Sequence, residues 1–470
     1  MTPNQSLYKS SQLREFLRAD YLQGIYSVFP YEVLERYNLS GTRDRIFNNE
    51  NTILTMIYSS TQADKTLQNA VNIFSRVYEN QSNRIIRDAE SAIELEKKED
   101  LKINEVRRGP KKKYKLKILK SKISEVSSNT AAYSKARMRV NFELLYEIFE
   151  KTRENKDSKY SWYGMRTYIT DGTYVQMQDT KELREIYDVK YNDEGNKEGY
   201  PQGLVQAIIE QGSGFIHDYA LSNRHASELS LVYKLIKGIP KGSLLLADDL
   251  YNCYAIFALV KRQGFDIIVP GKRVKKYKVI EAIGEGDEIV EVEKNEHPKW
   301  LPEDESLPKK LLLRRISFLS LDGTGTMVIY TTLIDKNIPK CDIILKYFTR
   351  WDIEITIREV KTIMDINVLR GKTDDIVRKE LVSAFIAYNL IRTLIMQSTK
   401  ETAFSPERDI IQEFFENNKD ILMDRKGRVY TKWSSGRYGE TEKENIKTYY
   451  TPEARKALSQ NNKESKVQEI

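Results

Sequence analysis

The middle of the chain shows the alternation of apolar and polar positions that is typical of β-strands. Residues 166–178, RTYITDGTYVQMQ, alternate in this way and are rich in β-branched and aromatic side chains, so they are predicted to form a strand. Residues 203–210 and 214–221 are predicted to form two more strands, joined by a Gly-Ser-Gly turn. Three strands are therefore expected in succession.

The pattern after these strands changes to helical spacing and then varies. A helix is predicted over 226–236 and another over 252–263. Between them, GSLLLA at 242–247 is a continuous apolar run, which is typical of a strand buried on both faces. Residues 265–270 are predicted to form a further strand. This order of elements predicts an α/β fold with a mixed sheet rather than a doubly wound one.

Composition divides the chain into three regions. Residues 1–155 are expected to form a mainly helical N-terminal region, because good helix formers are common there and few prolines or glycines interrupt them. Residues 160–400 are expected to form the α/β domain, and residues 401–470 a polar C-terminal tail. Residues 272–338 are strand-like, charged and interrupted by glycine and proline, which predicts a β-rich insertion in the α/β domain.

One segment of the N-terminal region carries a dense positive charge. Residues 107–122, RRGPKKKYKLKILKSK, hold nine lysines and arginines and no acid, whereas the whole chain has a net charge of +8. A basic run can be a solvated helix face or a linker, but the one-signed density of this run makes contact with phosphates at least as strong an expectation. The N-terminal region is therefore predicted to bind DNA, through Arg107, Arg108, Lys111, Lys112, Lys113 and Lys115.

Cysteine and histidine usage narrows the possible chemistry. The chain has two cysteines and three histidines, so it has neither a disulfide framework nor a thiolate zinc site, and no histidine pair has a metal-binding spacing. A reducing, cytoplasmic compartment is expected. Neither a signal peptide nor a membrane-spanning stretch is visible. If the chain is an enzyme, carboxylates are expected to carry the reaction.

Two aspartates stand where a carboxylate could be catalytic. Asp248 directly follows the apolar run 242–247, at the end of a buried strand, where open α/β sheets place ligand sites. It could equally cap the next helix, and its neighbour Asp249 could take either role. Asp171 lies in the first predicted strand beside Gly172, which allows another group to approach the backbone closely. Asp-Gly is also a common turn pair.

A third acid lies in the segment YFTRWDIEITIREVK, residues 347–361, which has helical spacing. At about 100° per residue, four polar side chains would fall within a stripe roughly 60° wide on one helix face: Tyr347, Arg350, Glu354 and Lys361. A neighbouring apolar stripe would dock the helix onto a core: Ile353, Ile357, Val360 and Met364. An ion-paired surface helix is the simpler alternative, with Arg350 and Glu354 as a pair worth about 0.2–0.5 kcal/mol.

Taken together, these segments resemble the DDE transposases of the insertion-sequence-four family. The family's hallmark is Tyr, two residues, Arg, three residues, Glu, six residues and Lys, and the stripe from Tyr347 to Lys361 satisfies every spacing of it. DGT at Asp171, with a later Asp-Thr pair, is similar to the family's first motif, and LLLADDLYNCY around Asp248 to its second. Asp249 departs from the family, which often has a basic residue there. The resemblance covers residues 128–393.

The resemblance implies a ribonuclease-H-like core with its first aspartate on the first strand, its second after the fourth strand and its glutamate on a late helix. It implies that Asp171, Asp248 and Glu354 bind Mg²⁺, for which Mn²⁺ can substitute, and catalyse strand cleavage at transposon ends and strand transfer into target DNA. Double-stranded DNA is the expected partner, and a homodimer is expected in the DNA complex. The DNA-binding residues implied near the glutamate are Tyr347, Arg350 and Lys361.

Two alternatives stay open on the sequence. The chain could be a catalytically inactive or repurposed DNA-binding protein, although the three acids are intact. It could also be a ribonuclease-H-like nuclease that only cuts, although the polar stripe around Glu354 favours transposition, which demands extra phosphate contacts.

Overall fold

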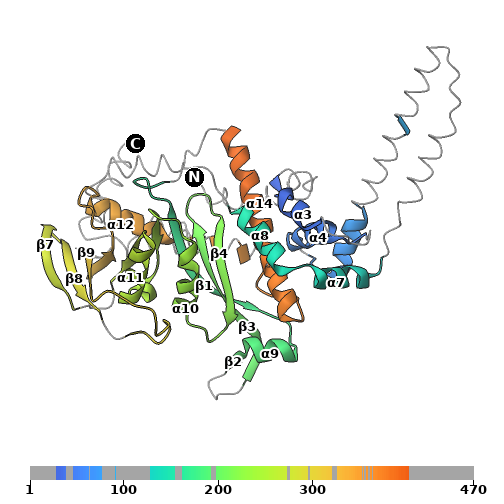
Figure 1. Cartoon of the computed structure of the whole chain (residues 1–470), viewed down its shortest axis with the longest axis horizontal. Helices are drawn as coiled ribbons and strands as arrows, with labels where there is room; N and C mark the ends of the chain where they lie inside the picture. The colour runs from blue at the N-terminus through green and yellow to red at the C-terminus, as the bar shows by residue number, and fades with distance from the viewer. Residues whose placement is uncertain are drawn as a thin grey trace, which may run out of the picture. The chain divides into compact units, whose positions relative to one another are not determined.

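The chain, seen here in a computed structural model, forms two compact units (Figure 1). The α/β unit comprises residues 1–28, 153–372 and 388–470, and the helical unit comprises residues 29–152 and 373–387. The residues that the structure describes are 28–38, 46–62, 64–76, 90–91, 128–153, 161–191, 197–271, 276–294, 297–319, 325–351, 353, 356–357, 360–361 and 364–401.

The described part of the helical unit consists of helices. Asn48 begins one of them, because its side chain accepts a hydrogen bond from the Asn51 backbone N–H at 2.8 Å. The basic segment 107–122 and the tail from 402 lie outside the described residues. No helix that the structure describes is long and apolar enough to cross a membrane. The helices are α3 Tyr31–Asn38, α4 Asn49–Ser60, α7 Thr130–Arg139, α8 Phe142–Thr152 and part of α14 Asp374–Glu401.

The α/β unit is built on one ten-stranded sheet in the order β2-β3-β1-β5-β6-β10-β9-β8-β7, with β4 paired to β3. Strands β1, β5 and β6 run parallel, and the remaining pairs are antiparallel. The predicted mixed α/β fold is therefore confirmed. The strands are β1 Thr167–Gln176, β2 Val189–Tyr191, β3 Lys197–Glu210, β4 Ile216–Asn223, β5 Leu244–Leu246, β6 Asp266–Pro270, β7 Lys278–Gly284, β8 Asp287–Glu293, β9 Lys310–Leu319 and β10 Thr326–Thr331.

Helices cover both faces of this sheet. Leu245 packs into a core with helices α10 and α11, whereas Leu244 and Leu246 pack into a second core with α12. Successive side chains of a strand point to opposite faces, so a strand covered on both sides must be apolar throughout, as the run 242–247 predicted. The helices of this unit are α9 Lys181–Tyr187, α10 Glu228–Leu235, α11 Tyr254–Gln263 and α12 Lys340–Phe348.

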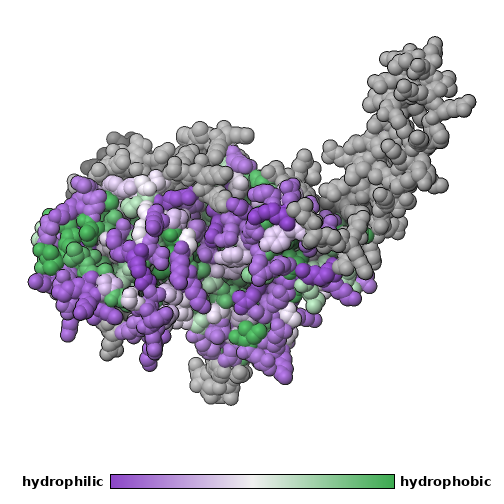
Figure 2. Space-filling model, viewed as in Figure 1, coloured by the Kyte–Doolittle hydropathy of each residue, from purple (hydrophilic) through white to green (hydrophobic). Residues whose placement is uncertain are grey.

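Strands β7 to β10 lie within the segment predicted to be a β-rich insertion. β10 pairs with β6, so these four strands extend the same sheet rather than forming a separate one. Figure 2 shows hydrophobic side chains gathered at the β7–β9 end of the sheet. The exposed large hydrophobic residues there are Val279, Ile280, Leu312 and Leu319.

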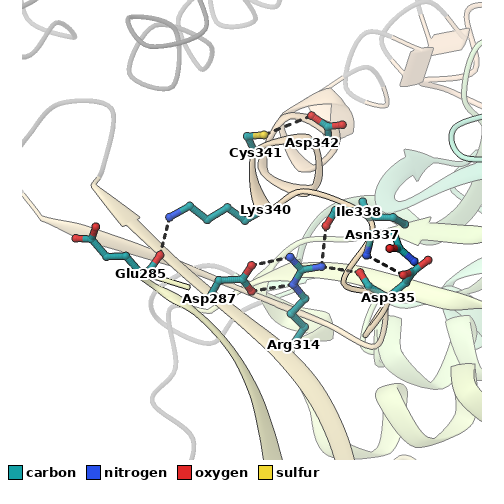
Figure 3. A network of polar contacts seen from close by, with 9 residues as sticks. All are labelled: Glu285, Asp287, Arg314, Asp335, Asn337, Ile338, Lys340, Cys341 and Asp342. Carbon is teal, nitrogen blue, oxygen red and sulfur yellow. Dashed lines mark hydrogen bonds and ion pairs between the residues drawn. The ribbon is translucent and has the colours of Figure 1, made fainter. Parts of the chain in front are cut away.

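A buried ion pair ties this extension to the segment that leads into α12 (Figure 3). The Arg314 guanidinium on β9 donates two hydrogen bonds to the Asp287 carboxylate on β8, at 2.8 and 2.6 Å. It also donates to the backbone oxygens of Asp335 and Ile338, at 2.8 and 2.9 Å. The two side chains are only 1% and 5% exposed. Arg314 therefore holds the backbone just before the helix that carries Tyr347.

Candidate active site

Asp171 lies within β1, where its Cα is opposite Ala207 of β3. The alternative of an Asp-Gly turn is therefore wrong. Its Oδ1 accepts a hydrogen bond from the Gly172 N–H at 2.9 Å. Burial raises the pKa of Asp171 to about 6, against the lowering effect of that N–H and of the nearby Arg350 guanidinium. Because burial makes the charged form of this carboxylate unfavourable, a cation bound beside it would stabilise that form.

Asp248 lies beside Asp171 because of the register of two parallel strands. Ile169 of β1 is paired with Leu246 of β5, and each aspartate follows two residues later. Asp248 begins a short 3₁₀ turn, Asp249–Tyr251, and its Oδ1 accepts a hydrogen bond from the Leu250 N–H at 2.9 Å. It therefore caps this short turn and not the next helix, α11, which begins after Cys253. Asp248 also follows the carboxyl end of the buried strand β5, where open α/β sheets place ligand sites.

Tyr347 and Arg350 approach the aspartates from α12 and the turn after it. The predicted single helix over 347–361 is wrong, because α12 ends at Phe348 and Thr349–Trp351 form a 3₁₀ turn. Tyr347 is buried, and its phenol lies near the Arg350 guanidinium. Burial raises the pKa of Tyr347, which Arg350 lowers and Asp248 raises. The phenol and the guanidinium thus lie within electrostatic range of the two aspartates.

Lys361 also belongs to this group. Burial lowers the pKa of its ammonium group, and the Asp171 carboxylate acts in the opposite direction. The predicted apolar stripe beside it is confirmed at Ile353, Val360 and Met364, which are all buried. Glu354 itself lies outside the described residues, as do the six basic candidates between 107 and 115.

Glu228, on the first turn of α10, is a residue that the sequence did not single out. Its Oε2 accepts a hydrogen bond from the Tyr251 hydroxyl at 3.1 Å. Burial raises the pKa of Glu228, which Tyr251 lowers and Asp248 raises. An acid just after Ser227 is typical of the start of a helix. The sequence around Glu228 therefore has a local explanation and does not indicate that the residue lies beside the two aspartates.

The described donors suit a hard divalent cation. Asp171 and Asp248 offer carboxylate oxygens, the ligand type that Mg²⁺ prefers. Among the described residues, no three acidic, histidine or cysteine side chains converge into a complete metal site. A third ligand from the segment around Glu354 would be needed to complete one.

Comparison with known proteins identifies the α/β unit. Residues 162–390 match the family model "Transposase DDE domain". The chain is 25% identical to the transposase InsG of insertion sequence element IS4 from Escherichia coli K12, over 56% of this chain and 60% of that protein. It is 24% identical to the putative transposase InsZ of the same organism, over 28% of this chain and 46% of that protein.

Further similarities are shorter or weaker. A probable transposase for element IS5377 from Geobacillus stearothermophilus is 41% identical over 13% of this chain and 16% of that protein. The piggyBac transposase in a synaptic complex with hairpin DNA matches at a TM-score of 0.33 and 8% identity, over 94% of this chain and 85% of that one. The chain spans less than two thirds of the length of each of these three curated relatives. Residues 162–390 are therefore identified as a transposase DDE domain, and over part of its length the chain is similar to the transposase of element IS4.

Proposed function

We propose that the chain is a DNA transposase that cleaves strands at transposon ends and transfers them into target DNA, with Asp171, Asp248 and Glu354 as its catalytic carboxylates. The register of β1 and β5 is the observation that carries the proposal, because each aspartate follows two residues after a member of the aligned pair Ile169 and Leu246. The order β4-β3-β1-β5-β6 is in line with a ribonuclease-H-like core.

The three carboxylates would hold Mg²⁺, or Mn²⁺ in its place. When bound, a pair of such ions activates the attacking oxygen and stabilises the leaving oxygen of an in-line phosphoryl transfer. Cleavage by water and strand transfer by a DNA 3′-hydroxyl are the same type of reaction, so one site serves both.

The cations around the carboxylates would bind the DNA backbone. Arg350 offers a planar fork that matches a phosphate, and it lies beside the buried Tyr347. Lys361 offers a point charge beside Asp171. Double-stranded DNA is the proposed partner. A homodimer is proposed in the DNA complex, because two transposon ends must be joined in one reaction.

An excision assay tests this function in cells. The native DNA that flanks the gene would bracket a selectable marker, and the protein would be supplied as wild type or as Glu354→Ala. We expect marker loss with rejoining or reinsertion for wild type only. Excision by Glu354→Ala at the wild-type frequency would contradict the carboxylate assignment. No excision by either form, with DNA binding retained, would instead indicate an inactive or repurposed DNA-binding protein.

The basic segment 107–122 gives a separate prediction on DNA binding. Replacing Lys111, Lys112 and Lys113 together with glutamine should flatten the plot of log affinity against log salt concentration by about 0.9 for each phosphate that the protein no longer neutralises. Binding to a transposon-end duplex at several salt concentrations measures this slope. Lys181→Gln is the control, because this lysine is 91% exposed on α9. An unchanged slope in the triple variant would mean that the segment is a linker.

A further inference from the structure

The Glu228 carboxyl group fills the space that a side chain at position 172 would occupy. A Cβ built on Gly172 would lie 2.7 Å from Cδ of Glu228 and 2.9 and 3.0 Å from its two carboxylate oxygens. No real Cβ tolerates a contact of 2.7 Å, so the glycine next to Asp171 is what admits this carboxylate. The glycine of the DGT motif thereby leaves room for an acid from α10 beside the strand that carries Asp171.

A buried chain of hydrogen bonds fixes the direction of the bond to Glu228. Thr170 donates its hydroxyl to the Ala207 backbone oxygen at 3.0 Å, so it can only accept from Gln206, whose Nε2 lies at 2.8 Å. The same Nε2 donates its second hydrogen to the Tyr251 hydroxyl oxygen at 2.9 Å. Tyr251 donates its own hydrogen to Oε2 of Glu228, at 3.1 Å.

This chain of hydrogen bonds is more than a helix-capping arrangement needs. An acid in the first turn of a helix is stabilised by the helix dipole, typically by about 0.3–1 kcal/mol, without any partner from elsewhere. Here Gln206, Tyr251 and Thr170 are each no more than 1% exposed, and Tyr251 contacts one oxygen of Glu228 while Gln206 contacts Tyr251. The buried Tyr251 hydroxyl, which accepts a hydrogen bond from Gln206, therefore fixes the position of the Oε2 atom of Glu228.

The Glu228 carboxylate interacts electrostatically with the two aspartates of the proposed active site. The charges of Glu228 and Asp248 each raise the pKa of Asp171, and Asp248 raises that of Glu228, so the three groups share one electrostatic environment. Nevertheless, the described acids do not converge into a complete coordination group. Glu228 therefore lies within electrostatic range of the two aspartates.

We propose that Glu228 is a positioning residue of the transposase site: held by Tyr251 and Gln206, it accepts hydrogen bonds from the water shell of the divalent cation bound at Asp171 and Asp248. This inference rests on the proposed function. Mg²⁺ and Mn²⁺ keep several waters when carboxylates bind them, and a fixed carboxylate outside the ligand shell orients those waters. Its negative charge also adds to the attraction of the site for a cation.

The test measures cation binding by the full-length protein without DNA. Mn²⁺ affinity is read from the loss of the free-ion electron paramagnetic resonance signal, so the readout does not depend on activity. Glu228→Gln keeps the shape and removes the charge, and should weaken Mn²⁺ binding about tenfold. Tyr251→Phe should weaken it less, and the double variant should match Glu228→Gln, because the hydroxyl acts only through the carboxylate. The matched control is Glu182→Gln, an exposed first-turn acid on α9.

The outcomes separate this inference from the proposed function. Mn²⁺ binding that is lost in Asp171→Asn but unchanged in Glu228→Gln would overturn the role of Glu228 alone. Additive effects of Glu228→Gln and Tyr251→Phe would overturn the hydrogen-bonded chain as the means of positioning. Mn²⁺ binding that is equal in wild type and Asp171→Asn would overturn the proposed function and this inference with it. Thermal melting of each variant checks that the fold is intact.

Discussion

Replacing Asp171 with asparagine is expected to slow strand cleavage of a transposon-end duplex by about 10³-fold or more. A bound metal ion contributes several kcal/mol to stabilising the transition state, and about 1.36 kcal/mol corresponds to a tenfold change in rate. Asparagine keeps an oxygen that can accept the Gly172 N–H but loses the negative charge that would hold the cation. Single-turnover cleavage with Mg²⁺ measures the effect, and binding to the same duplex should be largely retained.

The same substitution should not destabilise the protein, and this separates lost chemistry from lost folding. Burial raises the pKa of Asp171 to about 6, so its charged form opposes folding. This cost is absent well below the unfolded pKa, grows as the pH rises between the unfolded and folded pKa values, and is complete well above the folded pKa. Without metal at a pH of about 7.5, Asp171→Asn should therefore melt at the wild-type temperature or above. Slow cleavage together with a lower melting temperature would contradict this explanation.

Replacing Asp287 with alanine is expected to cause the largest loss of stability. It leaves the Arg314 guanidinium buried without its carboxylate, and breaking a buried ion pair in this way costs about 3–5 kcal/mol. For a unit of this size, each kcal/mol lowers the melting temperature by roughly 2–4 °C, so a fall of roughly 6–20 °C is expected. Calorimetry or circular dichroism would measure the transition of the α/β unit.

Two variants give this prediction its controls. Glu281 lies on the neighbouring strand β7 and forms an ion pair with Lys336, in which both side chains are about half exposed. Glu281→Ala should therefore cost no more than about 1 kcal/mol of stability. The pair of substitutions Asp287→Leu and Arg314→Met should restore much of the loss, because an apolar pair leaves no buried charge. If Asp287→Ala melts like Glu281→Ala, the pair does not anchor the segment before α12.

Much of the fold could be predicted because local patterns of apolar and polar residues indicate its helices and strands. The alternation in 166–178 predicted β1, the run 242–247 predicted β5, and helical spacing predicted α10 and α11. The apolar residues of a strand or helix recur on the side that is buried, so a few neighbouring residues are enough to indicate the type of element. The motifs likewise indicated Asp171 and Asp248 before their places in the sheet were known.

The continuous helix predicted over 347–361 failed for a reason that local spacing does not reveal. Tyr347 and Arg350 fit an α-helical stripe, but Thr349 to Trp351 form a 3₁₀ turn, in which the residues per turn are fewer. The Thr349 hydroxyl donates to the Lys346 backbone oxygen at 2.6 Å at this point. Helical spacing in a sequence is therefore compatible with a helix that breaks where tertiary contacts demand it.

Local patterns along the chain are enough to predict the order of the elements, the mixed α/β class and the two candidate aspartates. The side chains that surround those aspartates, in contrast, are known only from the folded chain. Asp171 and Asp248 are neighbours through the parallel register of β1 and β5, and Glu228 joins them because Gly172 leaves room and Tyr251 donates a hydrogen bond to it. The periodicity of burial is a property of residues that are neighbours in the sequence. The contacts around the aspartates join residues far apart in the chain, so they form only when strand register and helix packing are set.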